Sequence, residues 1–179
     1  MFSKLRKQYS ATWEILSRFW QIYGGYKSWL SSPYLHLAVI LGGVTWWRWD
    51  STINGDWYDL VLSIIPDMLG FTLGGYAILL AFGNDRFKKE ILVGDPRPGE
   101  PSPYMVMSAV FMNFLMMMVL SLLYSLIAKA FSLSCGFGAL IGWVLFIYSA
   151  TLALAAVFWV FRLSDWFNKY NQVSRGDDN

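Results

Sequence analysis

The sequence predicts an all-α integral membrane protein with four transmembrane helices and an N-terminal amphipathic helix at the membrane interface. Hydrophobic residues make up 56% of the 179 residues and aromatic residues 18%, which is too many for a soluble fold of this length. Charged residues make up only 15%. They lie mainly in the ends and connections of the chain, and the apolar runs between them are long enough to span the hydrocarbon of a bilayer.

Residues 1–33 are predicted to form the interfacial helix and a linker. Apolar side chains recur every three or four positions there, and Gly24-Gly25 is expected to end the helix. Its basic residues and tryptophans favour a helix lying in the headgroup region. The alternative is a helix that packs on the cytoplasmic loops of the protein itself.

Residues 34–163 are predicted to form the four-helix transmembrane domain. Ser31-Ser32-Pro33 has the serines and the proline typical of a helix start. In the second helix, Pro66 is compatible with two structures. It either produces a kink inside a long helix or lies in the first turn of a helix that begins there. The predicted helices cover residues 34–49, a part of 60–83, 104–128 and 137–163.

The polar segments lie between and after these helices. Residues 84–103 are predicted to form a cytoplasmic loop, with a short polar helix over 84–90 followed by a proline-rich connector. Residues 129–136 are predicted to form a tight connection between helices three and four. Residues 164–179 are predicted to be a hydrophilic cytoplasmic tail.

The basic residues predict the orientation of the chain in the membrane. The chain has 14 basic residues, and all except Arg48 and Lys129 lie before helix one, between helices two and three, or after Phe161. Positively charged residues concentrate on the cytoplasmic side of membrane proteins. The sequence therefore predicts that the N-terminus, the loop 84–103 and the C-terminus are cytoplasmic.

Asp67 is the one acidic residue within a hydrophobic segment. A carboxylate in a membrane span suggests a functional site, such as a proton relay, an ion site or an interhelical ion pair. Lys129 and Arg48 are predicted at the same membrane edge, and we expect an ion pair between Asp67 and Lys129. If a helix began at Pro66, Asp67 would instead lie in its first turn and be stabilised by the helix dipole.

Asn113 lies near the middle of the third predicted helix. A buried amide in a membrane usually forms a hydrogen bond to a neighbouring helix, which predicts a packing role. Ser121 and Ser125 follow close to the same helix face, and their hydroxyls either bond backbone carbonyls or line a narrow wet path.

Two pairs of glycines have the spacing that lets helix backbones approach closely. They are Gly70 and Gly74 in the second helix, and Gly138 and Gly142 in the fourth. We expect Gly138 and Gly142 to pack within the chain, and Gly70 and Gly74 to lie at a close helix contact.

The sequence predicts no catalytic, cofactor-binding or metal-binding residues. Cys135 and His36 are the only cysteine and histidine, which leaves few ligands for a metal or haem. The methionines of the third helix include three consecutive ones, Met116 to Met118, which point around the helix and indicate adaptable packing. A net charge of +2 does not favour nucleic acid as a partner.

Residues 65–83, IPDMLGFTLGGYAILLAFG, resemble the second helix of a group of small, uncharacterised bacterial inner-membrane proteins. The resemblance implies a multi-pass protein of the bacterial inner membrane. Leu80-Ala81-Phe82-Gly83-Asn84-Asp85 is similar to a segment that leaves a membrane helix in the bestrophin channel family, although the large cytoplasmic domain of that family has no room here. In size and helix count the chain is also similar to membrane subunits of prophage-exclusion and phage-defence systems.

Two functions compete at this point. The first is a non-enzymatic membrane protein that assembles into a homo-oligomer and acts as a channel-like or membrane-permeabilising component, because four helices barely enclose a path whereas symmetric copies can build one. The second is a membrane anchor or scaffold for a soluble cytoplasmic partner, which would bind the N-terminal helix and the loop 84–103.

Overall fold

The computed structural model covers the whole chain and describes residues 2–48, 56–81 and 101–176. All regular structure in these ranges is α-helical. The helices are α1 (Phe2–Tyr23), α2 (Gly25–Leu30), α3 (Pro33–Trp47), α5 (Trp57–Ala81), α7 (Pro103–Ala130) and α8 (Gly136–Gly176).

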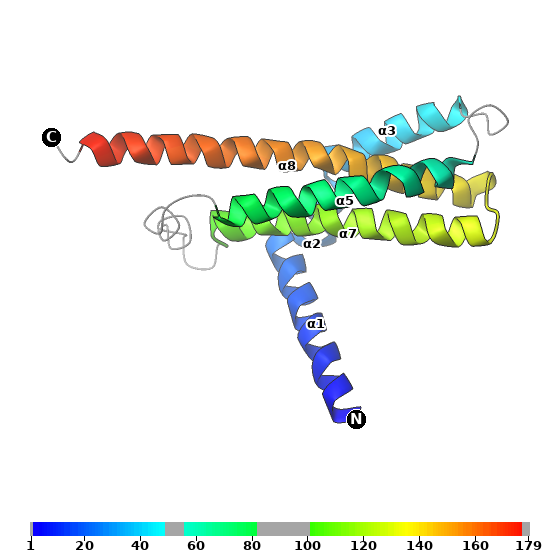
Figure 1. Ribbon diagram of the computed structural model, residues 1–179, viewed down its shortest axis with the longest axis horizontal. Coiled ribbons are helices and arrows are strands. Elements are labelled where there is room, and N and C mark those ends of the chain that lie inside the picture. The colour runs from blue at the N-terminus through cyan, green and yellow to red at the C-terminus, as the bar shows by residue number, and fades with distance from the viewer. Residues whose placement is uncertain (1, 49–55, 82–100, 177–179) are drawn as a thin grey trace.

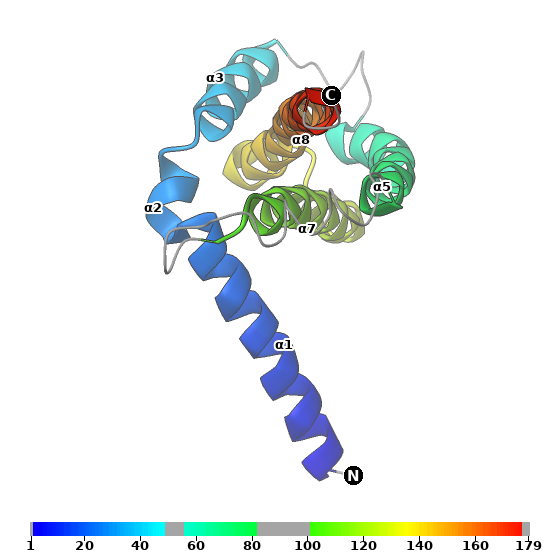
Figure 2. The ribbon, with the colours of Figure 1, turned by 90° about the vertical axis from the view of Figure 1, so that its left-hand side faces the viewer.

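The helices α5, α7 and α8 lie side by side as an antiparallel bundle (Figures 1 and 2). Ring contacts join Trp57 to Tyr124 and Tyr76 to Phe111, so the start of α5 packs beside the end of α7. The hydroxyl of Tyr124 in turn donates a hydrogen bond to the carbonyl oxygen of Gly138 at 2.8 Å, near the start of α8. Consecutive long helices therefore run in opposite directions.

The helix α3 packs against the first half of α8, also in the antiparallel direction. Near one end, the Thr151 hydroxyl donates to the carbonyl oxygen of Tyr34 at 3.1 Å. Near the other, the Trp143 indole donates to the Thr45 hydroxyl at 2.8 Å. Gly42 between them is buried against Val144, which leaves no space for a side chain on that side of α3.

Within residues 2–48, 56–81 and 101–176, three helices, α5, α7 and α8, are long and apolar enough to cross a membrane. The predicted first span corresponds to α3, whose 15 residues extend about 22 Å at 1.5 Å per residue. The hydrocarbon of a typical bilayer is about 30 Å thick. The structure thus supports a membrane protein with three spans, and a fourth span along α3 stays a prediction.

The N-terminal helix α1 projects away from the bundle in both views (Figures 1 and 2). It ends at Tyr23, where Gly24 has a φ of 91°. This backbone conformation favours glycine and stops the helix before Gly25. Only the C-terminal part of α1 reaches the bundle, where Phe19 is buried. The short helix α2 that follows was not predicted.

Two helix starts follow the signals in the sequence. Pro33 opens α3, although the Ser32 hydroxyl makes no capping hydrogen bond. Pro103 opens α7, and there the Ser102 hydroxyl does accept a hydrogen bond from the Met105 N–H, at 3.4 Å. The predicted helix over 84–90 and most of the connector before Pro103 lie outside the described residues.

The prediction was wrong about the C-terminal end of α8. We expected the helix to stop near Leu163 and a tail to follow, whereas α8 continues to Gly176. A helix can continue into water when side chains one turn apart stabilise it. Here Lys169 forms an ion pair with Asp165 at 2.7 Å, and the Arg162 guanidinium lies over the rings of Trp159 and Trp166.

Candidate functional site

The candidate site is a stripe of polar and small residues on the outward surface of α5, which also exposes the apolar side chains of Phe71, Leu73 and Ile78. Pro66 lies inside α5, so a helix that begins at this proline is excluded. The surface runs for five turns on one side of the helix, because its members are three or four positions apart. All of them are exposed, and we call them the α5 polar face: Asp59, Ser63, Asp67, Gly70, Gly74 and Ala77.

Asp67 lies near the middle of this face. It is eight residues beyond Asp59, which corresponds to about 12 Å along the helix. The apolar stretch of α5 runs from Trp57 to Ile78, so this carboxylate lies well inside the segment that can cross the membrane. Asp67 is exposed and forms no ion pair or hydrogen bond within the described part of the chain.

The ion pair that we predicted between Asp67 and Lys129 is not formed. The Lys129 ammonium instead bonds Asp59 at 2.8 Å, at the start of α5. Both side chains are more than half exposed. Because α5 and α7 are antiparallel, the end of α7 meets the first turn of α5 and not its middle. The predicted partner is therefore two turns away from Asp67.

The four glycines occupy different environments. A methyl group built on Gly70 or Gly74 would meet nothing within 4 Å, so neither is at a close contact within a single chain. A methyl group on Gly142 would overlap the rings of Trp57 and Tyr124, and one on Gly138 would lie 3.5 Å from the Tyr124 hydroxyl oxygen. The pair on α8 thus packs inside the bundle, whereas the pair on α5 faces away from it.

Asn113 lies inside the bundle and is only 2% exposed. Its amide nitrogen donates to the Tyr23 hydroxyl at 3.3 Å, which connects α7 with the end of α1. Burial, and then the neighbouring Tyr148, raises the pKa of Tyr23 above its usual value, so its hydroxyl stays neutral at physiological pH. The buried hydroxyls of Ser121 and Ser125 have no hydrogen-bond partner among the residues that the structure describes.

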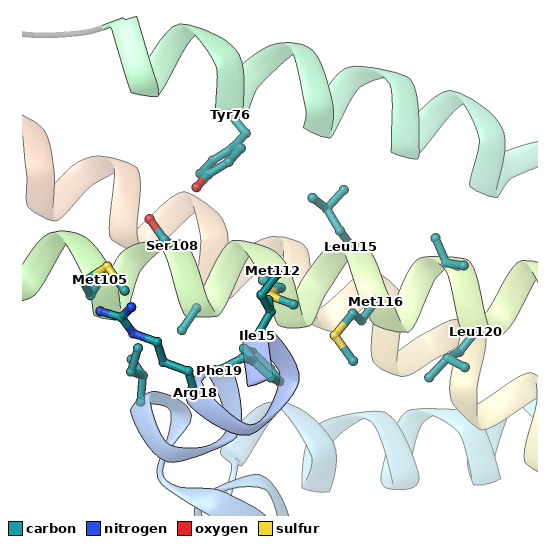
Figure 3. Close-up of a pocket in the computed structure, with 13 residues that line it drawn as sticks. Ile15, Arg18, Phe19, Tyr76, Met105, Ser108, Met112, Leu115, Met116 and Leu120 are labelled. Carbon is teal, nitrogen blue, oxygen red and sulfur yellow. The ribbon is translucent and has the colours of Figure 1, made fainter. Parts of the chain in front are cut away.

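A second feature is an apolar groove of about 720 Å³ between α1 and α7, closed on one side by Tyr76 of α5 (Figure 3). Met105, Met112 and Met116 line it. Arg18 lies beside Met105, at the end of the groove nearest the start of α7. The flexible thioethers of these methionines form much of its wall and leave the groove open.

Within the described ranges, no three His, Cys, Asp or Glu residues come together as metal ligands would. Cys135 is a free, exposed thiol in the connection between α7 and α8. The α5 polar face therefore offers one unpaired carboxylate, which can bind a cation, carry a proton or contact another chain.

Asp67, Gly70 and Gly74 were predicted as separate features of the second helix. The structure shows that they form one face with Asp59 and Ser63. The signal was their spacing, at positions 59, 63, 67, 70 and 74. Comparisons of the chain with protein-family models, curated proteins and solved structures give no match.

Proposed function

We propose that this protein forms a homo-oligomer in the membrane, in which the α5 polar faces of neighbouring copies surround a path for cations. The observation that carries the proposal is the outward orientation of Asp67 in the middle of an apolar helix. Carboxylates in membrane spans almost always face other protein or a water-filled cavity. A lipid-facing aspartate at the centre of a helix costs about 2.5–3.5 kcal/mol on insertion scales.

The surroundings of Asp67 fit contact with a second copy better than contact with lipid. Gly70 and Gly74 follow it on the same face, with open space beside them. Small residues at this spacing let two helix backbones approach closely in a membrane. Of the three candidate spans, α5 is also the one with the smallest buried share, 17% against 39% for each of the others.

Symmetry would repeat Asp67 once in each copy. Rings of aspartate or glutamate side chains are one basis of cation selectivity in pores. The carboxylate has no cationic partner within the described residues, so its charge would remain available to a passing ion. Ser63, one turn earlier on the same face, would add a hydroxyl to the wall of the path.

Reconstitution into liposomes tests this function. We expect wild-type protein to release potassium from loaded vesicles and Asp67→Asn to abolish most of the flux, while oligomer size in detergent stays the same. Asp59→Asn is the matched control, because Asp59 lies on the same face but at the edge of the span and is already paired with Lys129. No flux from wild type, or equal flux from Asp67→Asn, would contradict the proposal.

A second candidate function is a membrane scaffold, and the projection of α1 favours it. Tyr9 and Trp13 are 75% and 73% exposed, far from the contact between Phe19 and α7. Large exposed aromatic side chains mark either a protein-binding surface or a helix lying in the membrane interface. A scaffold without a path would show no potassium flux in the liposome experiment.

A further inference from the structure

A cleft of about 430 Å³ lies between the α2–α3 junction and the second half of α8, away from the α5 polar face. One wall carries hydroxyl groups, from Ser28, Ser31, Ser32 and Tyr34. The other wall is formed by α8, with Phe158 and Arg162. Among the described residues that line the cleft, Arg162 is the only charged one.

Arg162 lies near the C-terminal end of the apolar stretch of α8, which runs from Gly136 to Lys169. It is 26 residues beyond Gly136, which places it about 39 Å along the helix, more than the thickness of the apolar layer. Its guanidinium is held 5.2 Å from the ring centre of Trp159 and 5.1 Å from that of Trp166. Tryptophan and arginine at this level are typical of the boundary between lipid tails and headgroups.

The guanidinium of Arg162 has no carboxylate partner in the described part of the chain. The nearby Asp165 is paired with Lys169. An arginine fixed over aromatic rings keeps its N–H groups in the plane available for a phosphate, which it binds through two parallel hydrogen bonds.

The opposite wall contributes the N-terminus of α3. Its cap residue, Ser32, is only 7% exposed, and its hydroxyl forms no capping hydrogen bond. A helix N-terminus carries a partial positive charge and favours anions. Within the described residues this hydroxyl has no hydrogen-bond partner at all, so it can donate to an anion in the cleft. This observation is independent of Arg162 and also indicates an anion.

Apart from Tyr23, the remainder of the lining is mostly apolar and includes Val110, Leu152 and Ala155. A ligand that fills the cleft should therefore carry a negative charge at one end and a hydrocarbon chain at the other. We propose that the cleft binds an anionic phospholipid, with the phosphate at Arg162 and Ser32 and an acyl chain along α8. This inference does not depend on the proposed ion path.

Lipid binding to the full-length protein in a neutral detergent tests the proposal, with native mass spectrometry as the readout. The titrants are dioleoylphosphatidylglycerol, dioleoylphosphatidylcholine and, as a soluble phosphate, glycerol 3-phosphate. We expect wild type to retain phosphatidylglycerol more strongly than phosphatidylcholine. Arg162→Gln should weaken phosphatidylglycerol binding about tenfold, as expected for the loss of a charge-assisted hydrogen bond.

Arg48→Gln is the matched control, because it removes the same type of side chain at the other end of α3 and should leave binding unchanged. If Arg162→Gln alters the melting temperature without lipid, Ser32→Ala on the opposite wall provides the same test. Equal binding of the two lipids, or unchanged phosphatidylglycerol affinity in both cleft variants, overturns the proposal. Glycerol 3-phosphate binding as tightly as phosphatidylglycerol would show a soluble phosphate ligand and also overturn it.

Discussion

The indole of Trp57 lies directly against the backbone of Gly142, and the two residues join the start of α5 to α8. Trp57 is completely buried, and its ring nitrogen donates a hydrogen bond to the carbonyl oxygen of Leu133 at 2.9 Å. The ring of Tyr124 from α7 packs on the same place, with its centre 6.3 Å from that of Trp57. All three long helices therefore meet around a glycine that has no side chain to displace.

Replacement of Gly142 by alanine should destabilise the protein. The new methyl group would overlap the rings of Trp57 and Tyr124, and overpacking of this kind typically costs about 1–3 kcal/mol. Thermal unfolding in detergent should show a clearly lower melting temperature. Gly43→Ala is the control, because nothing lies within 4 Å of that position and alanine favours the helix. Equal melting temperatures for the two variants would show that the contact is not tight.

Several helix boundaries could be predicted from the sequence because single residues determine them. The break after Tyr23 follows from Gly24 with its positive φ, and the starts of α3 and α7 follow from Pro33 and Pro103. Such signals act on the local backbone, whatever the rest of the chain does. The C-terminal end of α8 was predicted too early because the stretch after Leu163 is polar, as in a tail. Contacts one turn apart, such as Lys169 with Asp165, support a helix there.

A second prediction concerns the hydrogen bond between Asn113 and Tyr23, which ties α1 to the bundle. Tyr23→Phe keeps the ring and removes the acceptor, leaving a buried amide without this partner. We expect a loss of stability of about 1 kcal/mol and faster hydrogen exchange in α1 than in wild type. Tyr9→Phe is the control, since Tyr9 is exposed and forms no hydrogen bond within the described residues. Unchanged exchange rates in α1 after Tyr23→Phe would mean that the hydrogen bond does not hold this helix.

The ion pair between Lys129 and Asp59 should contribute little to stability. Both side chains are exposed, and ion pairs in contact with water gain little net energy. We therefore expect Lys129→Gln to change the melting temperature much less than Gly142→Ala does. It should also leave the potassium flux of the proposed path intact, because Asp67 does not depend on Lys129. A loss of flux in Lys129→Gln would indicate that the lysine reaches Asp67 after all.

The partner of Lys129 could not be read from the sequence. Both Asp59 and Asp67 were available, and the choice depends on the register between α5 and α7, which tertiary packing sets. Ring contacts such as Tyr76 with Phe111 fix this register in the structure. The face that contains Asp67 was also missed, because Pro66 left the start of the helix open and hid the regular spacing on both sides of it.

The predicted orientation can be tested with the thiol of the native protein. Cys135 is exposed in the connection between α7 and α8, which the positive-inside rule places on the extracytoplasmic side. In intact cells it should react with a membrane-impermeant maleimide. Ser102→Cys in a Cys135→Ala background should react only after the cells are opened. The reverse pattern would reverse the orientation of the whole chain.

The last prediction addresses assembly through the α5 polar face. Gly74 has open space around it in a single chain, so Gly74→Leu should not disturb the fold of one copy. If two α5 helices approach at this face in the membrane, the leucine would force their backbones apart and lower the oligomeric state. Cross-linking in the membrane and light scattering in detergent measure this, and the melting temperature of the separated copies should remain close to that of the wild type. Gly43→Leu is the control, because Gly43 has equally open surroundings on α3, outside the α5 polar face. An oligomer of unchanged size in Gly74→Leu would remove this face as the contact between copies, and with it the proposed path past Asp67.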